Sequence, residues 1–195
     1  MAALTHVIVG YDFSHSAHAA LQRAVSIASR APAHVLHVIC VVDPRSPIPS
    51  IPSYDGVVYL YAARVQEVLA VHIQQELELA ESQNRVHFFV HARIGEKPAV
   101  EILQLAKEIG ADLIVVGNHG LTGVERLLVG STSERIVREA GCSVEIARTK
   151  RYADVELLTV VDAEPEDHDH PYIPPHRYTY EDRRVNLRPP EWPLY

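Results

Sequence analysis

Residues 115–137 read VVGNHGLTGVERLLVGSTSERIV and contain the most informative pattern in the chain. Gly117 and Gly120 are followed, after nine intervening residues, by Gly130 and Ser131, which gives the spacing G-x2-G-x9-G-[ST]. The first pair follows an apolar run that is typical of a buried strand, and the second pair precedes a helical pattern. Glycine lacks a Cβ atom, so it permits positive φ angles and close approach of a ligand to the backbone. The stretch therefore predicts a strand, a glycine-rich loop and a helix in succession.

The helix is predicted to begin at Ser131, because Ser131 and Glu134 have the S-x-x-E spacing of a capping box. The N-terminus of such a helix presents unpaired N–H groups and the positive end of its dipole, which together bind anions. The hydroxyl groups of Ser131, Thr132 and Ser133 would add hydrogen-bond donors to a phosphate. A purely structural alternative stays open, in which the glycines shape turns and Ser131 only caps the helix.

On either side of this stretch, short β-branched runs alternate with helical patterns over residues 1–150. Connections of this length join parallel strands by right-handed crossovers, which predicts an α/β fold with helices on both faces of one sheet. In such a sheet, ligands bind beyond the carboxyl ends of the strands. The expected strands are 6–10, 35–42, 86–94, 113–116 and 143–147, and the expected helices are 17–30 after a cap at Ser14 or Ser16, 59–81, 98–109 with Gly110 as its stop, and 131–140.

Other nucleotide-binding patterns are missing from the sequence. There is no G-x-x-x-x-G-K-[ST] and no G-x-G-x-x-G, so a phosphate would be held by backbone and hydroxyl groups only. Asp12 follows the first expected strand, where its carboxylate can accept from ribose hydroxyl groups, hold a phosphate-bound cation through water, or form an Asx turn. Val41, near the end of the second expected strand, would either line an adenine ring or pack in the core.

The composition disfavours several classes of protein. The net charge of −7 and the lack of an obvious basic face disfavour nucleic-acid binding. The apolar runs fall short of the ~18 residues that a membrane span needs, and the N-terminus lacks a basic region and a cleavage site, so a cytoplasmic location without a membrane partner is expected. Cys40 and Cys142 are the two cysteines, and both are expected to be buried free thiols.

Residues 151–195 differ in composition from the rest of the chain. They hold 5 Lys and Arg against 10 Asp and Glu, whereas residues 1–150 hold 13 against 15. They also contain seven of the thirteen prolines, five of the nine tyrosines and no glycine. We therefore place a domain boundary near Lys150, with one α/β domain over 1–150 and an acidic Pro- and Tyr-rich tail over 151–195. The aromatic residues of the tail favour docking onto a partner subunit or over the nucleotide cleft, and its histidines, in a solvated setting, are not assigned as a metal site.

Three segments resemble the universal stress protein family: HVIVGYDFSHSA (6–17), ADLIVVGNHGLTGVERLLVGSTSERIV (111–137) and AGCSVEIAR (140–148). The resemblance covers residues 4 to about 148. It implies a Rossmann-like open five-stranded parallel sheet of order 3-2-1-4-5, a homodimer through the last strand and, in members that keep the glycine motif, bound ATP, for which we expect Mg²⁺ as the cation. Carried over by position, the implied nucleotide-binding residues are Asp12, Val41, Val116, Gly117, Gly120, Gly130, Ser131, Thr132 and Ser133.

The function implied by this resemblance is ATP-dependent regulation in a stress response, with at most slow hydrolysis. No catalytic residue is assigned, because His119 in the loop has no identifiable carboxylate partner and no paired carboxylates or Cys/His nucleophile arrangement occurs at useful spacing. A hydrolytic or nucleotidyl-transferring enzyme is a weaker alternative, because the sequence has no H-x-G-H. The main alternative is a nucleotide-independent dimeric scaffold that uses the aromatic tail.

One residue departs from the family pattern in the last expected strand, SVEIA, which Glu145 interrupts. If Glu145 pointed into a dimer interface at a two-fold axis, two like charges would meet, which is unfavourable. Alternatively, Glu145 faces solvent or Arg148 of the partner, because neighbouring side chains on a strand point to opposite faces.

Overall fold

The structure of the protein is a computed structural model that describes residues 4–43, 45–51, 56–79, 86–120 and 130–149. The middle of the glycine-rich loop, 121–129, and the tail from Lys150 onward lie outside the described residues. The domain boundary near Lys150 and the docking of the tail therefore stay predictions.

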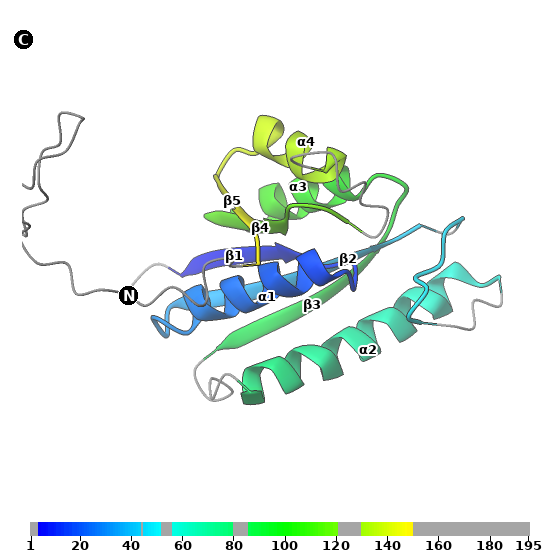
Figure 1. Ribbon diagram of the computed structural model, residues 1–195, viewed down its shortest axis with the longest axis horizontal. Coiled ribbons are helices and arrows are strands. Elements are labelled where there is room, and N and C mark those ends of the chain that lie inside the picture. Colours follow the sequence, from blue (N-terminus) through cyan, green and yellow to red (C-terminus); the bar gives the residue numbers. More distant parts are fainter. Residues whose placement is uncertain (1–3, 44, 52–55, 80–85, 121–129, 150–195) are drawn as a thin grey trace, which may run out of the picture. The chain divides into compact units, whose positions relative to one another are not determined.

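One parallel sheet of five strands forms the centre of the described domain, in the order β3-β2-β1-β4-β5 (Figure 1). This confirms the predicted fold class and strand order. β1 is the middle strand, and Val7 pairs with Leu36 of β2 on one side and with Leu113 of β4 on the other. The strands are β1 (Thr5–Gly10), β2 (His34–Val42), β3 (His87–Ile94), β4 (Leu113–Gly117) and β5 (Ser143–Ala147).

Among the described residues, four helices cover the two faces of the sheet, because β1, β2 and β4 are mostly apolar on both sides, as buried parallel strands are. Val7 and Val9 of β1 belong to a core with α1 and α2, whereas Ile8 between them packs with α3 and α4. Figure 1 shows the same division into two helical layers. The helices are α1 (His15–Ala28), α2 (Val58–Leu79), α3 (Pro98–Ile109) and α4 (Ser131–Glu139).

The helix ends follow the predicted signals at two positions and differ at a third. Ser14 caps α1 by accepting the N–H of Ala17 at 3.1 Å, and Gly110 ends α3 in the left-handed conformation, with φ of 65°. The capping box at Ser131 is wrong: the N-cap of α4 is Gly130, and no side chain caps it. The carbonyl of Gly130 already accepts the N–H of Glu134 at 2.9 Å, so Ser131 is the first residue of the helix.

The strand order places the candidate site. The order reverses at β1, because β2 continues the sheet on one side and β4 on the other. α1 leaves the carboxyl end of β1 toward one face, and the loop after β4 leads to α4 on the other face. A crevice forms where connections diverge in this way, and ligands of open α/β sheets bind there.

Candidate functional site

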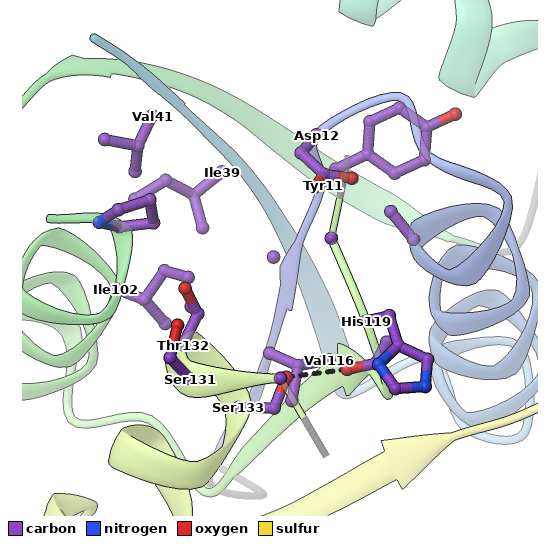
Figure 2. Close-up of a pocket in the computed structure, with 16 residues that line it drawn as sticks. Tyr11, Asp12, Ile39, Val41, Ile102, Val116, His119, Ser131, Thr132 and Ser133 are labelled. Carbon is purple, nitrogen blue, oxygen red and sulfur yellow. Dashed lines mark hydrogen bonds between the residues drawn. The ribbon is translucent and has the colours of Figure 1, made fainter. Parts of the chain in front are cut away.

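A cavity of about 280 Å³ lies at the carboxyl edge of the sheet, where the strand order reverses (Figure 2). Its volume is close to the lower end, about 300 Å³, of the range for small-molecule sites. All nine residues predicted from the sequence line it: Asp12, Val41, Val116, Gly117, Gly120, Gly130, Ser131, Thr132 and Ser133. The structure thus brings together residues that are separated by more than a hundred positions in the sequence.

The wall formed by β2 and α3 is apolar. Ile39 and Val41 project from β2, and Ile102 projects from α3. Figure 2 shows these three side chains gathered on one side, with Asp12 and Tyr11 across the cavity from them. A flat apolar group such as an aromatic base fits against a wall of this kind, because it would remove branched aliphatic side chains from water.

The N-terminus of α4 forms the floor of the same cavity. Ser131, Thr132 and Ser133 are its first three residues. Among the described residues, their backbone N–H groups have no hydrogen-bond acceptor, because the helical ladder begins with the N–H of Glu134. Unpaired N–H groups at the positive end of a helix dipole attract anions. The cavity therefore combines an apolar wall with an anion-attracting floor.

The three serine and threonine hydroxyl groups of this turn are not equivalent. The Ser133 hydroxyl donates to the carbonyl of Gly117 at 2.7 Å, and Ser133 is only 5% exposed (dashed line in Figure 2). A hydroxyl has one hydrogen to donate, so this one is already used within the protein. The hydroxyl groups of Ser131 and Thr132 belong to more accessible residues and remain the side-chain donors of the turn.

The physical reason for glycine at the positions of the motif differs from the predicted one. None of Gly117, Gly120 and Gly130 has a positive φ angle. A Cβ atom on Gly117 would lie 2.7 Å from the backbone carbon and oxygen of Ser16, so this glycine lets α1 approach β4. At Gly120, a Cβ atom would lie 2.9 Å from Oδ2 of Asp12. At these two positions the close approach is made by the protein itself.

The side chain of Asp12 forms the Asx turn that was one of its predicted roles. Oδ1 accepts the N–H of Ser14 at 3.0 Å, at the junction of β1 and α1. Between the two residues, Phe13 has a positive φ of 64°, which is uncommon for an aromatic residue. The turn fixes Asp12 at the rim of the cavity, where its other oxygen, Oδ2, faces Gly120.

Seven residues that line the cavity were not among the nine predicted: Gly10, Tyr11, Ala17, Ile39, Pro98, Ile102 and His119. Ile39 could have been found, because strand residues two apart share a face and Val41 was predicted. Ile102 has no local signal, since it reaches the cavity only through the packing of α3. Burial raises the pKa of Tyr11 to about 12, with smaller contributions from the charges of Glu76 and Asp12, so its phenol stays protonated at neutral pH.

Glu145 of β5 is paired within its own chain. Its carboxylate accepts from Nε of Arg23, on α1, at 2.5 Å and from the second guanidinium nitrogen Nη2 at 3.4 Å. This arrangement was not among the alternatives considered from the sequence, because Arg23 and Glu145 are separated by 122 positions. The pairing compensates the negative charge in the last strand. Both side chains are about one-third or more exposed, so the pair contributes at most about 1 kcal/mol to stability.

The parallel sheet, its strand order and the cavity at the reversal define a Rossmann-like α/β protein with a ligand site at the carboxyl edge of the sheet. Residues 4–148 match the universal stress protein family, and the chain belongs to that family. A relative from Staphylococcus epidermidis, assigned by name to the same family, is 34% identical over 155 residues, which are 77% of this chain and 87% of the relative.

Two solved structures are also similar. Universal stress protein UspA from Lactobacillus plantarum is 30% identical with a TM-score of 0.57, and the match covers 76% of this chain and 100% of that one. A universal stress protein in complex with cAMP is 25% identical with a TM-score of 0.50, over 76% of this chain and 100% of that one. No helix among the described residues is both long and apolar enough to cross a membrane.

Proposed function

We propose that this protein binds an adenine nucleotide, ATP with Mg²⁺, in the cavity at the carboxyl edge of the sheet and acts as a nucleotide-dependent regulator. The observation that carries the proposal is the floor of the cavity. The N–H groups of Ser131, Thr132 and Ser133 have no acceptor among the described residues, and they lie at a helix N-terminus. This is the arrangement that binds phosphate groups.

The apolar wall supports the choice of adenine. Ile39, Val41 and Ile102 offer a surface on which a purine ring can pack, and the floor lies within the same cavity. The similar universal stress protein in complex with cAMP carries an adenine nucleotide. In our assignment, Val41 contacts the base, Gly120 and Gly130 let the loop backbone follow the ribose and phosphates, and Val116 and Gly117 form the end of β4 beneath them.

Regulation is favoured over catalysis by the side chains around the cavity. His119 lines it, but no carboxylate is hydrogen-bonded to His119 among the described residues. A general base needs a partner that orients it, so we expect at most slow hydrolysis. A bound nucleotide would then act by favouring one conformation or assembly state over another.

Calorimetric titration of nucleotide-stripped protein with ATP, ADP, AMP and cAMP tests the proposal. The decisive variant is Thr132→Glu, which places a negative charge at the floor of the cavity while favouring the helix dipole. We expect the ATP affinity to fall about 10- to 100-fold, because like charges a few Å apart repel strongly outside bulk water. Val137→Glu, at an exposed position of the same helix, adds the same charge away from the cavity and should keep the affinity.

Equal ATP affinity in these two variants would place the phosphates elsewhere. If no nucleotide binds to the wild type, the glycine loop is structural, and the scaffold alternative is favoured.

The role of Asp12 can be separated from its structural role by the variant Asp12→Asn. Asparagine keeps the side-chain oxygen that accepts from Ser14, so the Asx turn is preserved, but it removes the charge. If Asp12 holds Mg²⁺ through water, the variant loses the gain in ATP affinity that Mg²⁺ gives the wild type. If Asp12 accepts from the ribose, AMP affinity without Mg²⁺ falls as well.

The fold also supports a homodimer through β5. Among the described residues, this strand is at the edge of the sheet, with β4 on its other side, and one row of its backbone groups has no strand partner there. Light scattering of the full chain, compared with a variant carrying Ile146→Pro, tests this arrangement. Proline removes a backbone N–H from the edge and should convert dimer to monomer. A dimer that survives uses a different surface.

A further inference from the structure

A cluster of metal-binding side chain types lies away from the nucleotide cavity, between α1 and α2. His18 is on α1, and His72 and Glu76 are one turn apart on α2, so the latter two side chains share a helix face. One nitrogen or oxygen ligand atom from each residue lies within 4.8 Å of the other two. Among the described residues, this is the one group of three such side chains that meets that distance.

The donor set is that of a transition metal. Two imidazoles and one carboxylate bind zinc or iron(II), usually with water in the remaining positions. His18 Nε2 and Glu76 Oε2 are 3.8 Å apart, and ligands around a tetrahedral zinc with bonds of about 2.0 Å lie about 3.3 Å apart. The separation of this pair of ligand atoms is therefore close to the spacing that an ion requires.

Burial and neighbouring groups act on both imidazole rings of the cluster. Burial lowers the pKa of His72, against an opposing effect of the charge of Glu76. The amide nitrogen of Gln22 lies 3.1 Å from Nε2 of His18, so Gln22 would give up this contact when Nε2 binds an ion. Metal binding requires both imidazoles to be neutral.

The surroundings of the cluster hold it in place. The hydroxyl of Tyr11 lies 2.6 Å from Nε2 of His72 and orients the ring, as outer partners of metal-binding histidines do. The Glu76 side chain is 13% exposed, and its Oε2 lies 3.8 Å from Nε2 of His18. A cation bound between the two residues would compensate the charge of this largely buried carboxylate. Surface hollows lined by His18 and Glu76, and by His72, give an ion access from solvent.

We propose that His18, His72 and Glu76 form a binding site for a divalent transition-metal ion, zinc(II) being the fitting choice for a three-ligand site with one water. The site joins α1 to α2, and its position is independent of the nucleotide cavity except for Tyr11, which lines that cavity and contacts His72.

A second histidine group serves as an internal comparison. His6, His37 and His91 form a row across β1, β2 and β3, with nitrogen contacts of 3.0 and 3.1 Å. These contacts occupy both ring nitrogens of His37, and among the described residues no carboxylate joins this row to form a possible metal-binding group. His168, His170 and His176 lie in the tail, outside the described residues.

The test uses the full chain without an affinity tag, stripped of metal by a chelator. Zn²⁺ binding is measured by calorimetry, and Co²⁺ is added as a spectroscopic probe whose visible absorption reports its ligands. We expect one tight site in the wild type, and affinity lower by roughly 100-fold in each of His18→Gln, His72→Gln and Glu76→Gln, since even loss of an outer partner costs about 10- to 100-fold. His91→Gln and the combined change of His168, His170 and His176 to Gln should keep the site.

Thermal unfolding gives a second readout that does not depend on the heat of binding. Zn²⁺ should raise the Tm of the wild type and of the His91→Gln control, but not that of His72→Gln, because a ligand stabilises only a fold that binds it. Equal Zn²⁺ affinity in the wild type and in all three ligand variants would overturn the proposal. Loss of binding only when the tail histidines are changed would also overturn it.

Discussion

The two ends of the glycine motif look alike in the sequence but have different roles in the structure. Gly117 ends β4 and touches the backbone of α1 at Ser16, so it is required by internal packing. Gly130 caps α4 with a φ of −71°, and a Cβ atom there would meet the nearest atom at 3.4 Å, an ordinary contact. One motif therefore combines a packing constraint at its first glycine with a cavity-facing turn at its last.

The largest expected effect comes from making the same substitution at both ends. Gly117→Ala should destabilise the protein by about 2 to 3 kcal/mol, because its Cβ atom cannot fit 2.7 Å from backbone atoms of Ser16. Gly130→Ala should cost less than about 1 kcal/mol, mainly because alanine is a poorer N-cap than glycine. Urea unfolding of the two variants beside the wild type measures both values.

Gly141→Ala is the control for glycine replacement in general, since a Cβ atom there meets nothing within 4 Å. If Gly117→Ala and Gly130→Ala lose the same stability, the contrast between the two ends of the motif is wrong. A tolerated Gly117→Ala would mean that α1 can move away from β4.

The difference between Gly117 and Gly130 also shows which features of the site could be predicted from the sequence. The position of the site followed from local patterns, because apolar periodicity predicts the strands and the carboxyl ends of parallel strands meet at one edge. The reason that residue 117 is glycine could not be predicted from local patterns, because Ser16 is about a hundred residues away and no local pattern reports a contact between them. The same distance in sequence hid the pairing of Arg23 with Glu145.

The start of α4 shows a limit of a different kind. Ser131 and Glu134 match the capping-box pattern and α4 begins at Ser131 as predicted, but the N-cap is Gly130, whose carbonyl accepts the first helical N–H. Helix starts depend on backbone angles that Gly130 adopts as readily as serine does. The missing side-chain cap has a functional consequence, because the N–H groups of Ser131, Thr132 and Ser133 are left without one.

An intermediate loss of stability is expected when the hydrogen bond that joins the two ends of the motif is removed. In Ser133→Ala, the carbonyl of Gly117 loses the hydroxyl that donates to it at 2.7 Å in a buried setting. Leaving a buried acceptor without a partner costs about 1 to 3 kcal/mol, so the urea midpoint should fall clearly. Ser133→Cys, which keeps the size and a weak donor, should recover part of the loss. An unchanged midpoint in Ser133→Ala would show that this bond does not support the end of β4.

The smallest effect on stability is expected at Ser131, two residues before Ser133 in the same turn. This position also gives the clearest contrast with Ser133. Ser131 is exposed and is the first residue of α4, and its hydroxyl makes no hydrogen bond to the part of the chain that the structure describes. Ser131→Ala should change the free energy of unfolding by no more than about 0.5 kcal/mol, as is usual for surface positions. If the turn holds phosphate groups as proposed, the same variant should lower ATP affinity about 3- to 10-fold, the value of one hydrogen bond. Urea unfolding and ATP titration of Ser131→Ala and Ser133→Ala, done in parallel, separate the role in binding from the role in packing. The assignment is wrong if Ser131→Ala loses stability. It is also wrong if Ser133→Ala loses ATP affinity without losing stability.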